Sequence, residues 1–275
     1  MSLRKDVARQ AFVWGLPTVT LYGVLHELVL SPGRDGHGTR LNRVLPGPVP
    51  ADVADVACLS EPPRPGTSSF CAWLDLRRGP VHLSVPPDAV GGPAYATLFD
   101  LYAEVVGQVP ERLDPSGRAF LLAGPSWEPA VPPDVVAVLR CETDLCLTVG
   151  HDRSDEYPAR SRPRREDLVV RPVDEGTDAP LPLPPPVPPV DVRRPPTVAF
   201  LTVLDWMLAL MPTRPGEEDL RAELEVVGVA CGPAALDDAI AEDRLDGHIT
   251  EGLRQGFEDV RQGVGTHRSD PLLRR

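Results

Sequence analysis

The sequence is poor in lysine, asparagine and positive charge, and each shortage excludes a class of chemistry. Lys5 is the only lysine and lies near the N-terminus, which argues against a Schiff-base lysine and against the lysine of a phosphate-binding loop. Asn42 is the only asparagine, and Val44 stands where an N-glycosylation site needs serine or threonine. The 28 Lys and Arg residues against 40 Asp and Glu give a net charge of −12. This charge argues against a nucleic-acid-binding surface, which needs concentrated positive charge.

Cysteines are few, and none forms a Cys-x-x-Cys pair. The five are Cys58, Cys71, Cys141, Cys146 and Cys231. The N-terminus carries no apolar core behind a basic start, and no uninterrupted apolar run reaches the ~18 residues of a membrane span. We therefore expect a soluble cytoplasmic protein with reduced thiols and no membrane association.

Motifs for metals and organic cofactors are missing. The pair His26-Glu27 lacks the second histidine that a zinc-binding helix carries four residues on. Neither a dinucleotide-binding glycine pattern nor a phosphate-binding loop occurs, nor does the serine elbow of hydrolases. Cys141, Cys146 and His151 come nearest to a metal-binding cluster, but no second cysteine pair accompanies them. The sequence predicts neither a metal nor an organic cofactor.

Proline is abundant, with 34 residues, and argues against a helical bundle. Apolar periodicity predicts helices near both ends of the chain, at residues 2–30 (one or two helices, interrupted at Pro17), 199–211, 217–227 and 236–263. Short apolar runs predict strands at residues 72–76, 81–85, 94–106, 119–123, 135–141 and 145–150. Hairpin-length connections join the second strand to the first and the last strand to the one before it. We therefore predict an α+β protein, with an antiparallel, strand-rich curved sheet or open barrel as its core and N- and C-terminal helices flanking it.

The composition changes twice along the chain and predicts three segments. Residues 1–150 contain the first helix and the β-rich core. Residues 151–197 form a charged and proline-rich bridge, in which the prolines from Pro180 to Pro196 favour polyproline II rather than a sheet. Residues 198–275 form a helical C-terminal part that we expect to pack on the same core.

One strand carries the candidate catalytic residues. In the segment 94–106, Asp100, Tyr102 and Glu104 alternate with apolar residues, so a strand would place the three polar groups on one face. If that face lines a cavity, one carboxyl group could donate a proton while the other accepts one. If it faces water, the three residues are an ordinary solvated strand face.

Neighbouring strands and turns supply candidate substrate-binding residues, which are Trp73, Asp75, His82, Arg140, Asp144 and His151. They could form an aromatic wall beside an acid, an imidazole and an anion-binding guanidinium. The structural alternatives are a buried tryptophan with a polar rim, an ion pair in a turn, and surface histidines.

Five stretches occur in an order that is itself informative. They are AFVWGLP at 11–17, AWLDL at 72–76, PVHLSVP at 80–86, LFDLYAE at 98–104 and VGVACGP at 227–233. The chain resembles the DUF1254 family, bacterial proteins named for a domain of unknown function, whose motifs follow in the same order. Where the family strand reads Leu-Leu-Asp-x-Trp-Thr-Asn, this chain has Tyr102 for the tryptophan and Glu104 for the asparagine. The resemblance implies a fold more than an activity.

The chain departs from the family pattern before the AWLDL strand. The family there carries Pro-Asn-x-Asp-Thr-Leu-Tyr-Ser, whereas this sequence reads PRPGTSSF at 63–70. The resemblance keeps Thr67 as a substrate-binding candidate, while Arg64 and Gly66 replace the family's asparagine and aspartate. The jelly-roll domain DUF1214, which commonly follows DUF1254, is absent from the sequence, so we expect a stand-alone member.

Three hypotheses about function remain. The first is a cofactor-independent acid/base enzyme that carries out elimination, hydrolysis or intramolecular cyclisation on a small molecule in a bacterial specialised-metabolite pathway. The second is an accessory or scaffolding subunit that binds a partner enzyme of the same pathway. The third is a small-molecule binder without catalysis.

Overall fold

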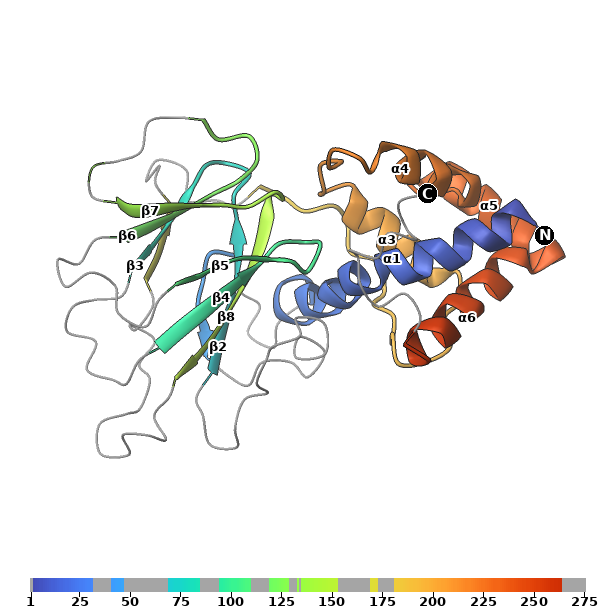
Figure 1. The fold of residues 1–275 in the computed structure, drawn as a ribbon, viewed down its shortest axis with the longest axis horizontal. Coiled ribbons are helices and arrows are strands. Elements are labelled where there is room, and N and C mark those ends of the chain that lie inside the picture. Colours follow the sequence, from blue (N-terminus) through green and yellow to red (C-terminus); the bar gives the residue numbers. More distant parts are fainter. Residues whose placement is uncertain are drawn as a thin grey trace. The chain divides into compact units, whose positions relative to one another are not determined.

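Helices from both ends of the chain and strands from its middle make up the protein (Figure 1). This computed structural model describes residues 2–31, 41–46, 69–84, 94–109, 119–128, 133, 135–152, 169–172 and 181–263. The helices are α1 (Leu3–Leu25), the π-helix η1 (His26–Leu30), α3 (Ala199–Leu208), α4 (Glu218–Leu224), the 3-10 turn η3 (Glu225–Val227), α5 (Pro233–Asp246) and α6 (His248–Arg261). The strands are β1 (Leu45–Pro46), β2 (Ser69–Asp75), β3 (Val81–Ser84), β4 (Ala94–Phe99), β5 (Val105–Val109), β6 (Ala119–Ala123), β7 (Val135–Arg140), β8 (Leu145–Asp152) and β9 (Val169–Pro172). The predicted α+β class is confirmed.

The described strands form two open sheets. The first has the order β1-β2-β8-β4-β5 and is antiparallel throughout. The second has the order β7-β6-β3-β9 and is mixed, because β6 and β7 run parallel. Neither sheet closes on itself, so the described strands form no closed barrel.

Apolar side chains from both sheets share one core. Alternate residues of a strand point to the same face, and β2 contributes Ala72 and Leu74 to this core. Val81 and Leu83 of β3, together with Leu122 of β6, come from the second sheet. Trp73 and Cys71, on the opposite face of β2, are buried as well, so both faces of this strand are covered.

Both hairpins predicted from the sequence are wrong. The connection between β2 and β3 leads from the first sheet to the second. The connection between β7 and β8 leads from the second sheet back to the first. The predicted continuous strand 94–106 is itself a hairpin, with β4 and β5 paired through a turn at Asp100–Glu104. Strand pairing depends on contacts far apart in the sequence, which a local apolar pattern does not contain.

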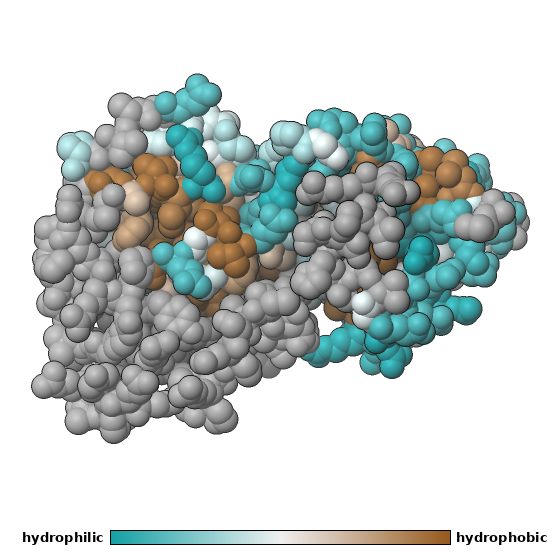
Figure 2. Space-filling view, in the orientation of Figure 1, coloured by the Kyte–Doolittle hydropathy of each residue, from teal (hydrophilic) through white to brown (hydrophobic). Residues whose placement is uncertain are grey.

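The chain divides into two compact units, Val24–Leu183 and a helical unit made of Met1–Gly23 and Pro184–Arg275. The two units do not coincide with the three segments predicted from the sequence, 1–150, 151–197 and 198–275. That division into domains stays a prediction. In the helical unit α6 packs closely on α1, because a Cβ added at Gly252 would lie 2.2 Å from the Lys5 carbonyl oxygen. Hydrophilic side chains cover much of the visible face of this unit (Figure 2).

Two helix boundaries differ from those predicted. α1 runs through Pro17 without interruption, and buried residues on both sides, such as Trp14 and Val19, hold it in place. The predicted helix 236–263 breaks at Gly247, whose φ of 66° is left-handed and ends α5. α1 and η1 together, Leu3–Leu30, are long and apolar enough by length and composition to cross a membrane, and half of the residues in their most apolar window are buried in the structure.

Candidate functional site

Most of the candidate residues lie at one end of the two sheets, here called the Asp75 end. It consists of Asp75–Pro80, Asp100–Glu104, Gly124–Glu128 and Arg140–Asp144. The antiparallel register places the end of β2, the end of β4 and the start of β8 at the same edge of the first sheet. Six of the predicted site residues belong to this end: Asp75, Asp100, Tyr102, Glu104, Arg140 and Asp144.

Backbone hydrogen bonds tie these loops together. The amide of Leu76 donates to the Asp144 carbonyl at 2.8 Å, and the amide of Cys141 donates to the Ala123 carbonyl at the same distance. The Thr143 hydroxyl accepts from the Leu101 amide at 3.1 Å and donates to the Leu145 carbonyl at 2.8 Å. Thr143 is fully buried and therefore fixes the loop 141–144 against the turn after β4.

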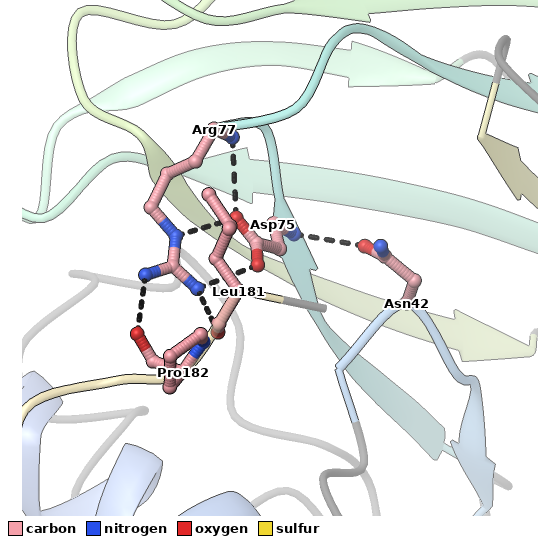
Figure 3. Close-up of polar contacts among 5 residues, drawn as sticks. All are labelled: Asn42, Asp75, Arg77, Leu181 and Pro182. Carbon is pink, nitrogen blue, oxygen red and sulfur yellow. Dashed lines mark hydrogen bonds and ion pairs between the residues drawn. The ribbon is translucent and has the colours of Figure 1, made fainter. Parts of the chain in front are cut away.

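Asp75 and Arg77 form a bidentate ion pair (Figure 3). Arg77 Nε lies 2.8 Å from Asp75 Oδ1, and Arg77 Nη2 lies 2.7 Å from Oδ2. The guanidinium also donates to the carbonyl oxygens of Leu181 (2.6 Å) and Pro182 (3.1 Å). Both side chains are largely buried, at 13% exposure for Arg77 and 3% for Asp75. Arg77 thus attaches the start of the proline-rich segment to the end of β2.

Asn42 holds the same strand end from the other side (Figure 3). Its side-chain oxygen accepts from the Asp75 backbone amide at 2.8 Å, and its backbone amide donates to the Trp73 carbonyl at 2.8 Å. Asn42 has a φ of 58°, a left-handed conformation that asparagine tolerates better than most residues. Sequence reasoning missed Asn42 and Arg77 as site residues. The Asp-x-Arg spacing at the end of a strand was the available signal for Arg77.

Asp144 is a titratable group beside this network. Its half-buried carboxyl group lies against Gly124, where an added Cβ would be 3.5 Å from Asp144 Oδ1. No described residue donates a hydrogen bond to this carboxyl group. Burial raises the pKa of Asp144, the charge of Arg77 lowers it, and the charge of Asp75 raises it again. The structure therefore places the Asp144 carboxyl group where the charges of both Arg77 and Asp75 act on it.

The three predicted catalytic residues do not share a strand face, so the alternation argument is wrong. Asp100 is 2% exposed, and its Oδ1 accepts from the amides of Tyr102 and Glu104, each at 2.9 Å. Ala103 closes the turn with a left-handed φ of 62°. Tyr102 is buried, whereas Glu104 is exposed. A turn-forming aspartate with carboxylate-to-amide bonds explains this geometry better than a cavity-lining strand does.

The remaining candidates lie apart from the Asp144 carboxyl group. Trp73 is fully buried in β2, and its indole nitrogen has no hydrogen-bond partner in the part of the chain that the structure describes. His82 is half-buried in β3, opposite Leu121 and Arg171. His151 lies near the far end of β8, and only its backbone is described. The candidate Thr67 and the rewritten loop around it lie outside the described residues, apart from Ser69 and Phe70.

Arg140 is exposed and engages Trp127. Its Nη1 donates to the Trp127 carbonyl, and its guanidinium carbon lies 5.3 Å from the centre of the Trp127 ring. Cation–π stacking of this kind holds both side chains on the surface of the Asp75 end. The pair could present a flat cationic surface to an anion, which is the role that the sequence suggested for Arg140.

Thiols are present in the part of the chain that the structure describes, and none of them is grouped there with other metal ligands. Cys71, Cys141, Cys146 and Cys231 are free. Among the described residues, no three His, Cys, Asp or Glu side chains are grouped to hold a metal ion. Burial, together with the charge of Glu27, raises the pKa of Cys71 to about 11, so this thiol is protonated at neutral pH.

Comparison with known proteins bears on the fold of this site. Residues 60–159 match the model of the family described as a protein of unknown function, DUF1254. The resemblance to DUF1254 is confirmed. The matched range contains Asp75, Arg77, Asp100 and Asp144, whereas Asn42 and Leu181 lie outside it. No curated protein matches the chain.

A solved structure has a similar fold. It is the crystal structure of the VPA0106 protein from Vibrio parahaemolyticus, which matches with a TM-score of 0.60 and 17% sequence identity. The match covers 94% of this chain and 59% of the VPA0106 chain. At this identity the likeness shows the fold alone. The DUF1254 description names no activity, and the residues of the Asp75 end are the basis for a proposal about the reaction.

Proposed function

We propose that the protein is a cofactor-independent acid/base enzyme acting on a small molecule, with Asp144 as the group that donates a proton. The observation behind the proposal is the half-buried Asp144 carboxyl group, which accepts no hydrogen bond from a described residue and lies beside the Asp75–Arg77 ion pair. Carboxyl groups whose pKa is shifted by burial and by a specific charged neighbour are common at catalytic sites.

The neighbouring charges suit a proton donor. Burial favours the neutral acid, which is the form that can give a proton to a substrate. After donation, the nearby Arg77 guanidinium stabilises the carboxylate that remains. Arg77 is itself held by Asp75 and by two backbone carbonyls, so its position is fixed before any substrate binds. Asp75 is a positioning residue in this scheme.

The reaction class follows from a single proton donor acting on a small organic substrate. Elimination, hydrolysis and intramolecular cyclisation all need a proton delivered to a leaving group or a carbonyl oxygen. We place this chemistry in a bacterial specialised-metabolite pathway and in the cytoplasm. The four free thiols among the described residues support a reducing compartment.

The test compares wild-type protein with Asp144→Asn and with Glu142→Gln, an exposed acid in the same loop. Each protein is incubated with a small-molecule extract of the source bacterium, and consumed and formed compounds are followed by mass spectrometry. We expect the wild type and Glu142→Gln to convert the same compound, and Asp144→Asn to convert it at least ~100-fold more slowly.

Other results point to the remaining hypotheses. Equal conversion by wild type and Asp144→Asn would exclude Asp144 as the proton donor. A compound that is retained in equilibrium dialysis but never converted would identify a small-molecule binder. Conversion that begins only when a second protein of the pathway is added, and that does not depend on Asp144, would identify an accessory subunit.

A further inference from the structure

Two cysteines meet in the core between the sheets, close to the Asp75 end. Cys141 directly follows β7 of the second sheet, and Cys146 is the second residue of β8 in the first sheet. Both belong to the apolar core, at 2% and 0% exposure, and Cys141 Sγ lies 4.0 Å from the carbonyl oxygen of Leu145, the residue next to Cys146. A side-chain bond here would join the two sheets.

The surroundings give the two sulfurs different chemical roles. The hydrogen bond from Cys146, with further bonds from Thr143, lowers the pKa of Cys141. Burial and the same contact raise the pKa of Cys146. Cys141 Sγ lies 3.6 Å from the Thr143 hydroxyl oxygen, which helps to hold a thiolate there. One sulfur is therefore the better nucleophile, and the other is a protonated neighbour that can resolve its oxidised form.

We propose that Cys141 and Cys146 form an oxidation site at which hydrogen peroxide converts two thiols into an intramolecular disulfide. In the first step the Cys141 thiolate attacks one peroxide oxygen, the O–O bond breaks, and a sulfenic acid and hydroxide form. In the second step the Cys146 sulfur, losing its proton, attacks the Cys141 sulfur. The S–O bond breaks, and hydroxide leaves and takes up a proton as water. The two sulfurs lose two electrons in all, and the peroxide gains them.

Burial makes the site selective for small oxidants. Peroxide is close to water in size, so burial hinders it less than it hinders bulky thiol reagents. Cys71 is a matched control, because it is also buried (3% exposure) but has no thiol neighbour among the described residues. Cys71 and Ala72 are adjacent in β2, and the apolar core holds Ala72, so Cys71 lies on the opposite face of the first sheet.

The experiment treats the native full chain with hydrogen peroxide, quenches it in acid, alkylates it under denaturing conditions and digests it with trypsin. Cleavage after Arg140 and Arg153 yields one peptide that contains both cysteines. We expect this peptide to be two hydrogens lighter, to resist alkylation, and to recover both thiols after treatment with dithiothreitol. Its thiols should be lost at least ~10-fold faster than the thiol of Cys71.

Cys146→Val removes the resolving thiol, so Cys141 should then accumulate as a sulfenic acid that dimedone traps. The wild-type peptide tests the proposal even if this variant fails to fold. The proposal is overturned if peroxide leaves both cysteines of the peptide open to alkylation while other residues oxidise. It is also overturned if the peptide is cross-linked to a different cysteine, or if Cys141 and Cys71 are oxidised at equal rates.

Discussion

The guanidinium of Arg77 meets the carboxylate of Asp75 through two parallel hydrogen bonds of 2.8 and 2.7 Å, although the two residues are only two positions apart in the sequence. Side chains at i and i+2 of a strand point to the same face, but β2 ends at Asp75 and the chain turns at Arg77. The turn allows the long arginine side chain to fold back over the carboxylate. Bidentate pairs of this type are among the strongest side-chain interactions, and this one also holds the Leu181 and Pro182 carbonyls.

Replacing Asp75 with asparagine should therefore destabilise the protein. Asp75→Asn removes the negative charge and places an amide donor against the Arg77 fork, which leaves a largely buried cation unpaired. We expect a loss on the order of 3 kcal/mol in the free energy of unfolding, measured by urea titration. Asp191→Asn is the control, because its pair with Arg194 is mostly exposed (82% and 52%) and should contribute less than about 1 kcal/mol. Equal losses in the two variants would mean that the Asp75–Arg77 pair does not hold the strand end.

Asp144 should make stability fall as the pH rises. Burial raises its folded pKa above the unfolded value of about 3.9, so between these values the folded chain holds a proton that the unfolded chain has lost. The stabilising contribution is complete below the unfolded pKa and is lost as the pH rises through the folded pKa. Asp144→Asn should thus match the wild type near pH 3.5 and be more stable at pH 7, by ~1 kcal/mol or less because the side chain is half-exposed.

Urea midpoints at the two pH values measure this effect, and Glu142→Gln in the same loop serves as the reference. A wild type that gains stability relative to Asp144→Asn as the pH rises would show that the carboxylate, and not the neutral acid, is the form that the fold favours. In that case Asp144 would be unsuited to act as a proton donor.

Short apolar runs were enough to predict most of the strands of this protein, but not the pairing of the strands. The run 72–76 was predicted as a strand because it is mostly apolar, and in the structure Ala72 and Leu74 lie in the core shared by both sheets while Trp73 is buried on the other face. The connection 76–80 was short enough for a hairpin, yet it links two sheets, and only long-range packing decides between these outcomes. This error does not affect the predicted α+β class, because the class depends only on the order of helices and strands along the chain.

The candidate site was predicted from the sequence only in part. Asp75 was proposed as an acid beside Trp73, and Asp144 as part of a turn near Arg140; in the structure the charge of Asp75 acts on the Asp144 carboxyl group. Asp100 was placed on a strand because Ala103 carries no sequence signal for its left-handed φ of 62°, where glycine or asparagine is usual. Arg77 was missed because its role depends on Leu181, which lies more than a hundred positions away.

Helix packing in the helical unit depends on the absence of a side chain at Gly252. A Cβ at this position of α6 would lie 2.2 Å from the Lys5 carbonyl oxygen and 2.9 Å from Ala8 Cβ, so Gly252→Ala must push α6 away from α1. We expect a loss of about 1–3 kcal/mol in the free energy of unfolding, followed by circular dichroism in urea. Gly23→Ala in α1 meets nothing within 4 Å and should instead stabilise by about 0.5–1 kcal/mol. A stabilising Gly252→Ala would contradict this helix contact.

Asp100 should prove to be a structural residue and not a catalytic one. Its buried Oδ1 accepts the amides of Tyr102 and Glu104, so Asp100→Ala leaves two donors of the turn without their acceptor and should cost about 2–3 kcal/mol. Asp100→Asn keeps an oxygen that can accept both bonds and should cost less. Glu104→Gln is an exposed control that should stay within ~0.5 kcal/mol of the wild type. Unfolding curves rank the three variants, and conversion of the small molecule identified with wild-type protein gives their activities. If Asp100→Asn folds as well as the wild type but loses ~100-fold in turnover, the catalytic acid lies in the turn after β4 and the assignment of Asp144 fails.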